Sequence, residues 1–509
     1  MKKPITLILM TGLLAAGLSS LTACGDNFDG LTINFWHTSG QTVANGFQKA
    51  ADDFAAKVLA HDNVKLRIKL TYKGGYDDLK GEIEKNLATG GNPTIAVAYP
   101  DHIADYFLAG DKNNHEYVVK LDDYANDDEI GFGREEWLGD SEGVEDFIQA
   151  YYEEGIQYQK EGLYSIPLLK STEAVIYNFN IVKDALIGKK INDTLTIQYD
   201  ADELISTEDD VRAFMSDISW ETFMDLCEFM YTNKNYLMPT MVWPCFYDSD
   251  SNLIISNFMQ ANMDYSGIVD GHGYIGFNGI ASNATSKQIE NYDYIIEELG
   301  KYKEWYDKGL FSTKGVYGEY SSNQLLSMKT VFAVGSTGGS GYSMPTSKDF
   351  QIGVCKVPYI NNNPLYVSQG ITLTLMNNAK LEKSGENDLA VKYGWKFIKY
   401  LTNAEVNANM ATTCSEGYMP VRDSAYNTSD FLGFMNSNTE YVKVAKVIID
   451  DIQNRYFNTA VFSGSAKLRE ATGGMLADVL KISGYKNMTE DQKLEAITTQ
   501  VNRAINAAI

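Results

Sequence analysis

Apolar and polar positions alternate with two different periods between residues 31 and 99. Residues 31–36 (LTINFW) and 65–72 are rich in strand-forming side chains. Between them, the apolar positions 43, 47, 50, 51, 54 and 58 have the spacing of an amphipathic helix. A second helix is predicted over 77–87, and the apolar run 94–99 follows the break at Asn92-Pro93. Strand, helix, strand, helix and strand in this order predict a parallel α/β sheet.

The same helix and strand patterns recur later in the chain, where irregular segments separate them. They predict strands over 173–178, 352–357 and 371–376, a helix that begins after an N-cap at Ser219, and helices over 390–401 and after 460. Two acidic insertions, 111–155 and 183–215, are expected to lie mostly at the surface. A chain of 509 residues exceeds one hydrophobic core, so we expect a two-lobed α/β body.

The first residues have the features of a targeting segment. Two lysines precede the apolar run 5–18, which is too short to span a bilayer and which small residues follow. Residues 1–23 therefore read as a signal peptide. The sequence Leu21-Thr-Ala-Cys24-Gly resembles the bacterial lipobox, which implies lipidation of Cys24 and a membrane-anchored linker over 24–30. The alternative is a secretory signal that only happens to contain Cys24.

Charge and composition exclude some functions and favour others. The formal net charge is −24, and removal of residues 1–23 takes away two lysines and no acid. This balance argues against nucleic-acid partners, which require clustered basic residues. The 33 tyrosines suit sugar ligands, because a ring packs on sugar C–H groups while its hydroxyl forms hydrogen bonds. A tyrosine-rich core would explain most of the same residues.

No motif points to a cofactor, a metal or a catalytic centre. The five histidines form no H-E-x-x-H pair, the Gly-rich stretch 338–341 lacks the lysine of a phosphate-binding loop, and residues 248–252 lack the glycine of a calcium loop. The cysteines after Cys24 are far apart, so buried thiols are expected, with one or two disulfides left open. These are Cys227, Cys245, Cys355 and Cys414.

Five segments, in order, resemble extracellular solute-binding proteins of family 1. They are INFWH at 33–37, LTYKGGY at 70–76, STEAVIYN at 171–178, SWETF at 219–223 and EGYMPVR at 416–422. The first three look most similar to glycerol-3-phosphate-binding members, and the maltose-binding group is the wider alternative. The resemblance runs from about residue 31 to the end of the chain.

The resemblance implies a type II periplasmic-binding fold, in which two α/β lobes are joined by crossing strands and enclose a ligand cleft. It divides the chain into lobe 1 (31–176 plus 334–375) and lobe 2 (177–333 plus 376–509). It also implies a monomer that passes its ligand to an ABC permease at the extracytoplasmic face of the membrane.

By resemblance, the ligand site includes Tyr76, Ser171, Ser336, Gly370, Tyr418 and Arg469. Arg469 is expected to clamp a phosphate through its planar guanidinium group, and Ser336 belongs to a loop suited to binding oxygen atoms. Trp36 and Trp243 are candidate stacking rings. The family has a glutamate after the tyrosine that matches Tyr99; here Pro100 and Asp101 follow, so Asp101 is the candidate replacement and a phosphorylated ligand comes into doubt.

The sequence therefore favours capture of a carbohydrate, a polyol or a sugar or glycerol phosphate by closure of two lobes, without chemistry. A secreted carbohydrate hydrolase remains an alternative, because its two carboxylates would be hidden among 67 acidic residues. A surface-scaffold lipoprotein is the third possibility, although the repeats that it predicts are absent from the sequence.

Overall fold

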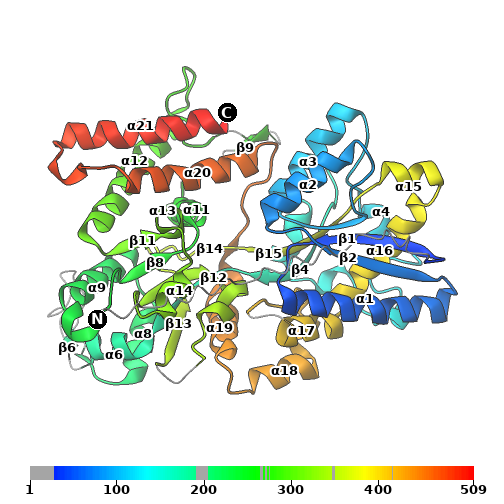
Figure 1. Ribbon diagram of the computed structural model, residues 1–509, viewed down its shortest axis with the longest axis horizontal. Helices are drawn as coiled ribbons and strands as arrows, with labels where there is room; N and C mark the ends of the chain where they lie inside the picture. Colours follow the sequence, from blue (N-terminus) through cyan, green and yellow to red (C-terminus); the bar gives the residue numbers. More distant parts are fainter. Residues whose placement is uncertain are drawn as a thin grey trace, which may run out of the picture.

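The computed structural model describes residues 28–187, 189–190, 204–263, 268–269, 272–273, 275–346, 350–414 and 417–509. The predicted signal peptide, Cys24, part of the second insertion and Glu416 lie outside these ranges. The described chain forms two mixed sheets, each covered by helices, with segments that pass between them (Figure 1). The predicted two-lobed α/β architecture is confirmed. No helix in the described ranges is both long and apolar enough to cross a membrane.

The first sheet contains five strands in the order β2-β1-β3-β15-β4. Its first three members are parallel, and β15 runs antiparallel to both β3 and β4. The helices α1 and α16 contact this sheet, and α2 and α3 contact each other on its upper side in Figure 1. The bounds are β1 Leu31–His37, α1 Gln41–Asp62, β2 Leu66–Tyr72, α2 Tyr76–Leu87, β3 Ile95–Ala98, α3 Pro100–Asn113, β4 Ile166–Ser171, β15 Gln369–Leu375 and α16 Asn387–Thr402.

The second sheet repeats the same scheme, with five strands in the order β11-β8-β12-β5-β13. Here β11, β8 and β12 are parallel, and β5 runs antiparallel to β12 and β13. The long helices α12, α20 and α21 pack together on this lobe (Figure 1). The bounds are β5 Glu173–Asn178, α9 Trp220–Thr232, β8 Cys245–Tyr247, α11 Asp250–Gln260, α12 Ser286–Lys308, β11 Phe311–Thr313, α14 Ser321–Leu326, β12 Phe332–Ser336, β13 Ile352–Lys356, α20 Ser465–Leu480 and α21 Glu490–Ala508.

The helices begin and bury their apolar faces where the local sequence pattern predicts. Helix α1 buries Val43, Phe47, Phe54 and Val58, the apolar positions that predicted it. Helix α9 begins after Ser219, whose hydroxyl accepts a hydrogen bond from the Thr222 amide, as the sequence predicted. Of the four cysteines after Cys24, Cys227, Cys245 and Cys355 are buried, and none of the four forms a disulfide within the described part of the chain.

The chain crosses between the lobes at Thr172, between β13 and β15, and along the segment that leads to α20. Two short strands in the last two crossings, β14 (Tyr366–Val367) and β16 (Tyr456–Phe457), pair in parallel. Sheet pairing and core packing differ from the predicted division for several segments, among them residues 173–176 of β5, which were assigned to lobe 1 but belong to the second sheet. Strand β13 was assigned to lobe 1 but pairs with β5 in the second sheet. Helix α16 was assigned to lobe 2, yet it buries Trp395, Phe397 and Ile398 in the first core.

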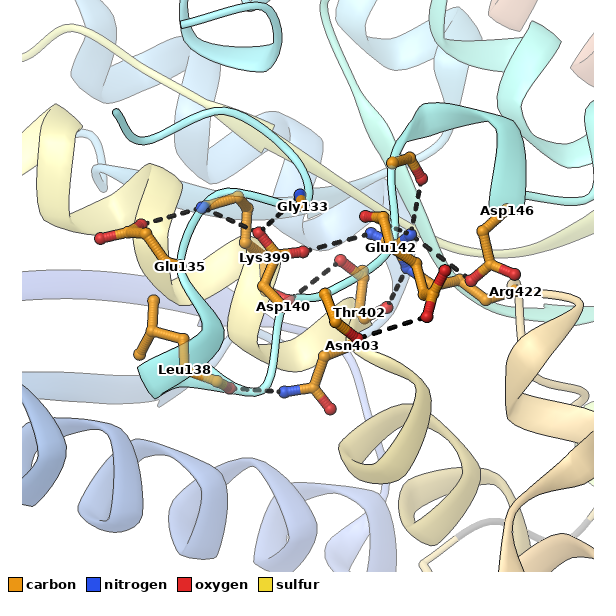
Figure 2. Close-up of polar contacts among 12 residues, drawn as sticks. Gly133, Glu135, Leu138, Asp140, Glu142, Asp146, Lys399, Thr402, Asn403 and Arg422 are labelled. Carbon is orange, nitrogen blue, oxygen red and sulfur yellow. Dashed lines mark hydrogen bonds and ion pairs between the residues drawn. The ribbon is translucent and has the colours of Figure 1, made fainter. Parts of the chain in front are cut away.

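The first acidic insertion is not the surface excursion that its composition suggested. Figure 2 shows Lys399 of α16 between two of its carboxylates: the Lys399 ammonium lies 2.8 Å from Glu135 and 3.0 Å from Asp140. Arg422 is 1% exposed and donates to the Gly143 carbonyl at 2.9 Å. Charges that are buried in this way need partners. The ion pairs therefore fasten the insertion to α16 and to the end of the EGYMPVR segment.

Candidate functional site

A cavity of about 760 Å³ is lined by residues from both lobes. Loop 38–43 follows β1 and residues 99–101 follow β3, so one wall lies at the carboxyl ends of the first sheet. The opposite wall contains residues 248, 249 and 252 after β8 and residues 335, 336, 338 and 339 at the end of β12 and just after it. Open α/β sheets bind ligands at these ends. The cavity is therefore the candidate ligand site.

Six of the predicted site residues line this cavity. They are Tyr76, Asp101, Ser336, Gly370, Tyr418 and Arg469. Ser171 does not line the wall directly, but its hydroxyl oxygen accepts a hydrogen bond from the Ser336 hydroxyl at 3.4 Å. That contact joins β4 of the first lobe to β12 of the second.

The two predicted tryptophans do not line the cavity. Trp36 is 8% exposed in the first core, and the Lys73 ammonium lies 3.8 Å from the centre of its ring. Trp243 precedes the amino end of β8, whereas the cavity lies beyond the carboxyl end of that strand. Its ring stacks on Tyr306 at 5.2 Å. The structure therefore places neither ring on the wall of this cavity.

Tyrosine supplies the inner aromatic surface. The rings of Tyr76 and Tyr99 stack at 3.8 Å with an interplanar angle of 12°. Tyr418 lies against the Gly338 backbone so closely that a Cβ on Gly338 would stand 2.5 Å from the ring. The Tyr418 segment is fixed by two backbone hydrogen bonds between Lys170 and Met419, 2.7 and 3.0 Å long. Burial raises the pKa of Tyr418 to about 12, so its hydroxyl stays protonated at neutral pH.

Arg469 is already paired with an acid. Its Nε and one terminal nitrogen each lie 2.8 Å from the same Asp101 oxygen. Because Arg469 belongs to α20 and Asp101 to α3, this ion pair connects the two lobes. Its charge is balanced within the protein, and a phosphate would have to compete with Asp101 for it.

A second buried ion pair lines the cavity. Lys170 is 1% exposed, and its ammonium lies 2.6 Å from Glu154, which belongs to the first acidic insertion. The Ser368 hydroxyl donates to the other Glu154 oxygen at 2.5 Å. The insertion thus contributes a wall of the cavity, a role that its sequence did not reveal.

Glu173 lines the cavity and directly follows Thr172, where the chain crosses between the lobes. The Tyr247 hydroxyl donates to one of its oxygens, and Asn252 donates to the other at 3.0 Å and to the Gln369 side chain at 3.3 Å. Burial, together with the nearby Asp248 charge, raises the pKa of Glu173 to about 7. Burial also raises the pKa of Asp248 to about 6. At neutral pH Glu173 is therefore partly protonated, whereas Asp248 is mostly ionised.

Three buried polar atoms on lining residues have no hydrogen-bond partner among the residues that the structure describes. They are the Ser39 hydroxyl oxygen, one Asp101 carboxylate oxygen and the Gln369 amide nitrogen. Buried polar atoms are nearly always satisfied. A carboxylate acceptor, an amide donor and a hydroxyl that can donate or accept suit a ligand that carries several hydroxyl groups.

A family model of the bacterial extracellular solute-binding proteins matches residues 49–436. This match covers most of the chain. The chain belongs to that family. Among curated proteins, none matches the sequence significantly.

Solved structures with low sequence identity share the fold of this solute-binding protein. The GacH receptor of Streptomyces glaucescens, described with acarbose, is 15% identical with a TM-score of 0.60 over 94% of this chain and 99% of the receptor. The sugar-binding protein MalE of Xanthomonas citri is 12% identical with a TM-score of 0.61 over 93% and 97% of the two chains. UgpB of Mycobacterium tuberculosis, in complex with glycerophosphocholine, is 16% identical with a TM-score of 0.59 over 93% and 98%. The periplasmic-binding fold is thereby confirmed.

Several lining residues of the solute-binding protein were not predicted. Asp248 and Asn252 follow β8, and their position at the carboxyl end of a strand was a usable signal. Glu173 was visible only as the start of a strand, and Glu154 only as one acid among many. Their position at the cavity depends on contacts between segments far apart in the sequence.

Proposed function

We propose that this solute-binding protein captures a neutral carbohydrate or polyol between its lobes and delivers it to an ABC permease. The cavity carries the proposal, because it combines tyrosine rings and carboxyl groups from both lobes with three polar atoms, on Ser39, Asp101 and Gln369, that have no partner among the described residues. Aromatic faces pack on sugar C–H groups, and the polar atoms match hydroxyls. The ligands of two structural relatives, acarbose and glycerophosphocholine, are compatible with a hydroxyl-rich solute.

The charges of the cavity favour a neutral ligand over a phosphorylated one. Arg469 is paired with Asp101 and Lys170 with Glu154, both at short distance. The remaining lining cation, Lys314, faces a wall that also contains Asp248 and Glu173. A phosphate placed here would meet more carboxyl groups than free cations.

The first experiment is a binding screen with a soluble form that begins at residue 25. Saccharides, polyols and their phosphates are tested by thermal shift and then by calorimetry. We expect one-to-one binding of a neutral saccharide or polyol, which is recovered chemically unchanged. A ligand at one hundred times its Kd should stabilise the protein by about 2.7 kcal/mol.

Three outcomes would contradict the proposal. Binding restricted to phosphate esters would remove the neutral ligand, and release of hydrolysed product would favour the hydrolase. The absence of binding to any carbohydrate or polyol would refute the ligand class. Trp243→Ala is the matched control, because this ring lies outside the cavity and its removal should leave affinity unchanged.

The location and the partner rest on the first residues and on the family. We propose that Cys24 carries lipid and holds the protein on the extracytoplasmic face of the membrane. Cells fed labelled palmitate should label the wild-type chain and not Cys24→Ser. Loss of the chain should abolish uptake of the identified ligand; uptake that persists unchanged would argue against the transport role.

A further inference from the structure

Two tyrosines at the cavity differ from the three inner ones in their exposure. Tyr320 is 53% exposed and Tyr342 is 68% exposed, although both belong to the cavity wall. Tyr76, Tyr99 and Tyr418 are only partly exposed. A lining residue that remains more than half exposed marks the place where the cavity meets solvent. The mouth of the cavity thus carries two large aromatic rings.

Tyr342 extends from the second lobe toward the first. It lies in the 3-10 turn η4 (Thr337–Ser343), where the neighbouring Ser340 and Ser343 are buried and anchor the turn. Its hydroxyl lies 3.8 Å from the position that a Cβ on Gly40 would take, in the loop after β1. The ring therefore stands at the boundary between the two lobes.

Tyr320 is fixed to the cavity wall by its neighbour. It caps helix α14, and the next residue, Ser321, donates its backbone N–H to Asp248 at 2.6 Å. The Lys314 ammonium lies 3.7 Å from the centre of the Tyr320 ring and covers one face. An aromatic ring held in place with a face available is a surface on which a sugar can stack.

We propose that Tyr320 and Tyr342 form an outer subsite for a further sugar unit of an oligosaccharide whose first units occupy the cavity. The inference rests on the proposed carbohydrate-binding function and deepens it, because it assigns a chain of sugars rather than a single one. The cavity volume of about 760 Å³ lies within the range that encloses ligands of drug size, which is larger than one hexose. An oligosaccharide that extends out of the cavity must pass the two exposed tyrosine rings.

The test measures affinity against chain length with the full chain, purified in detergent as the cell processes it. The probes are linear α-1,4-glucan, β-1,4-glucan, β-1,4-xylan and β-1,4-mannan oligosaccharides of one to six units, titrated by calorimetry. Affinity should rise with length in at least one series. In Tyr320→Ala/Tyr342→Ala, the longest member should lose about ten-fold in affinity, as expected for the loss of two aromatic contacts. The shortest bound member should change less than two-fold.

Two controls separate the rings from general effects. Tyr320→Phe/Tyr342→Phe retains both rings and should keep the rise with length. Tyr236→Ala removes a tyrosine that is 87% exposed and outside the cavity, and should change nothing.

The outcomes distinguish this inference from the function on which it rests. Affinity that does not depend on chain length, or equal affinities in wild type and the double alanine variant, would overturn the outer subsite while leaving carbohydrate binding in place. A wild-type protein that binds no saccharide in these series or in the earlier screen would refute the proposed function itself.

Discussion

Replacing Glu173 by glutamine should change how the stability of the protein depends on pH. Glu173 is 3% exposed, and burial raises its pKa from 4.5 to about 7. The folded chain therefore holds this proton up to about pH 7, whereas the unfolded chain releases it near pH 4.5. The stabilising contribution is complete below pH 4.5 and is lost as the pH rises through 7. At about 1.4 kcal/mol per pKa unit, the loss amounts to about 3 kcal/mol.

Urea unfolding of wild type and Glu173→Gln, without ligand, at several pH values from 4.5 to 8.5 measures this loss. Glutamine cannot ionise, so the free energy of unfolding of the variant relative to wild type should increase by about 3 kcal/mol across the range. Subtracting the wild-type value from that of Glu173→Gln removes the titrations of groups that do not interact with Glu173. Glu490→Gln is the control, because that side chain is 87% exposed and its removal should shift stability by less than about 0.5 kcal/mol at every pH.

A difference between Glu173→Gln and wild type that does not vary with pH would refute this reasoning. It would mean that the hydrogen bonds from Tyr247 and Asn252 stabilise the Glu173 carboxylate enough to offset burial. A difference that favours wild type as the pH rises would reverse the sign of the assigned pKa shift.

Three further perturbations follow from the same contacts. Tyr418→Ala should weaken ligand binding at least ten-fold in calorimetry with little effect on thermal unfolding, and unchanged affinity would remove Tyr418 from the site. Arg469→Met breaks the pair with Asp101 that joins the lobes, so neutral and phosphorylated ligands should lose affinity by a similar factor; a loss confined to phosphate esters would restore the phosphate clamp. Lys399→Met leaves the buried Glu135 with Lys396 alone and the buried Asp140 with the more distant Arg422 alone, and should lower the free energy of unfolding by about 3 kcal/mol. The control is Lys49→Met, because Lys49 and its partner Asp53 have side chains that are 74% and 47% exposed. This substitution should lower the free energy of unfolding by less than about 1 kcal/mol. Equal effects of the two lysine variants would contradict the structural role of the buried ion pairs.

The local elements and the type of fold could be predicted because they depend on short-range periodicity. The apolar spacing of residues 43–58 predicted α1, and the alternation over 65–72 predicted β2. Repetition of strand and helix then led to two α/β lobes. Family resemblance indicated five residues that line the cavity, and the departure from the family pattern after Tyr99 indicated a sixth, Asp101. The periodicity of the apolar side chains and the length of the chain leave few alternative fold classes for such a sequence.

Only the tertiary structure decided which charges and rings meet. An isolated arginine reads as a phosphate clamp, but Arg469 meets Asp101 from a segment more than 300 positions away. Acidic composition reads as a solvated surface, but Glu135 and Asp140 surround Lys399 in the interior. Trp243 reads as a stacking ring, but it lies at the opposite end of its strand from the cavity. The sequence determined the elements and their order through local periodicity, whereas the ligand site depends on long-range contacts, which no local pattern encodes.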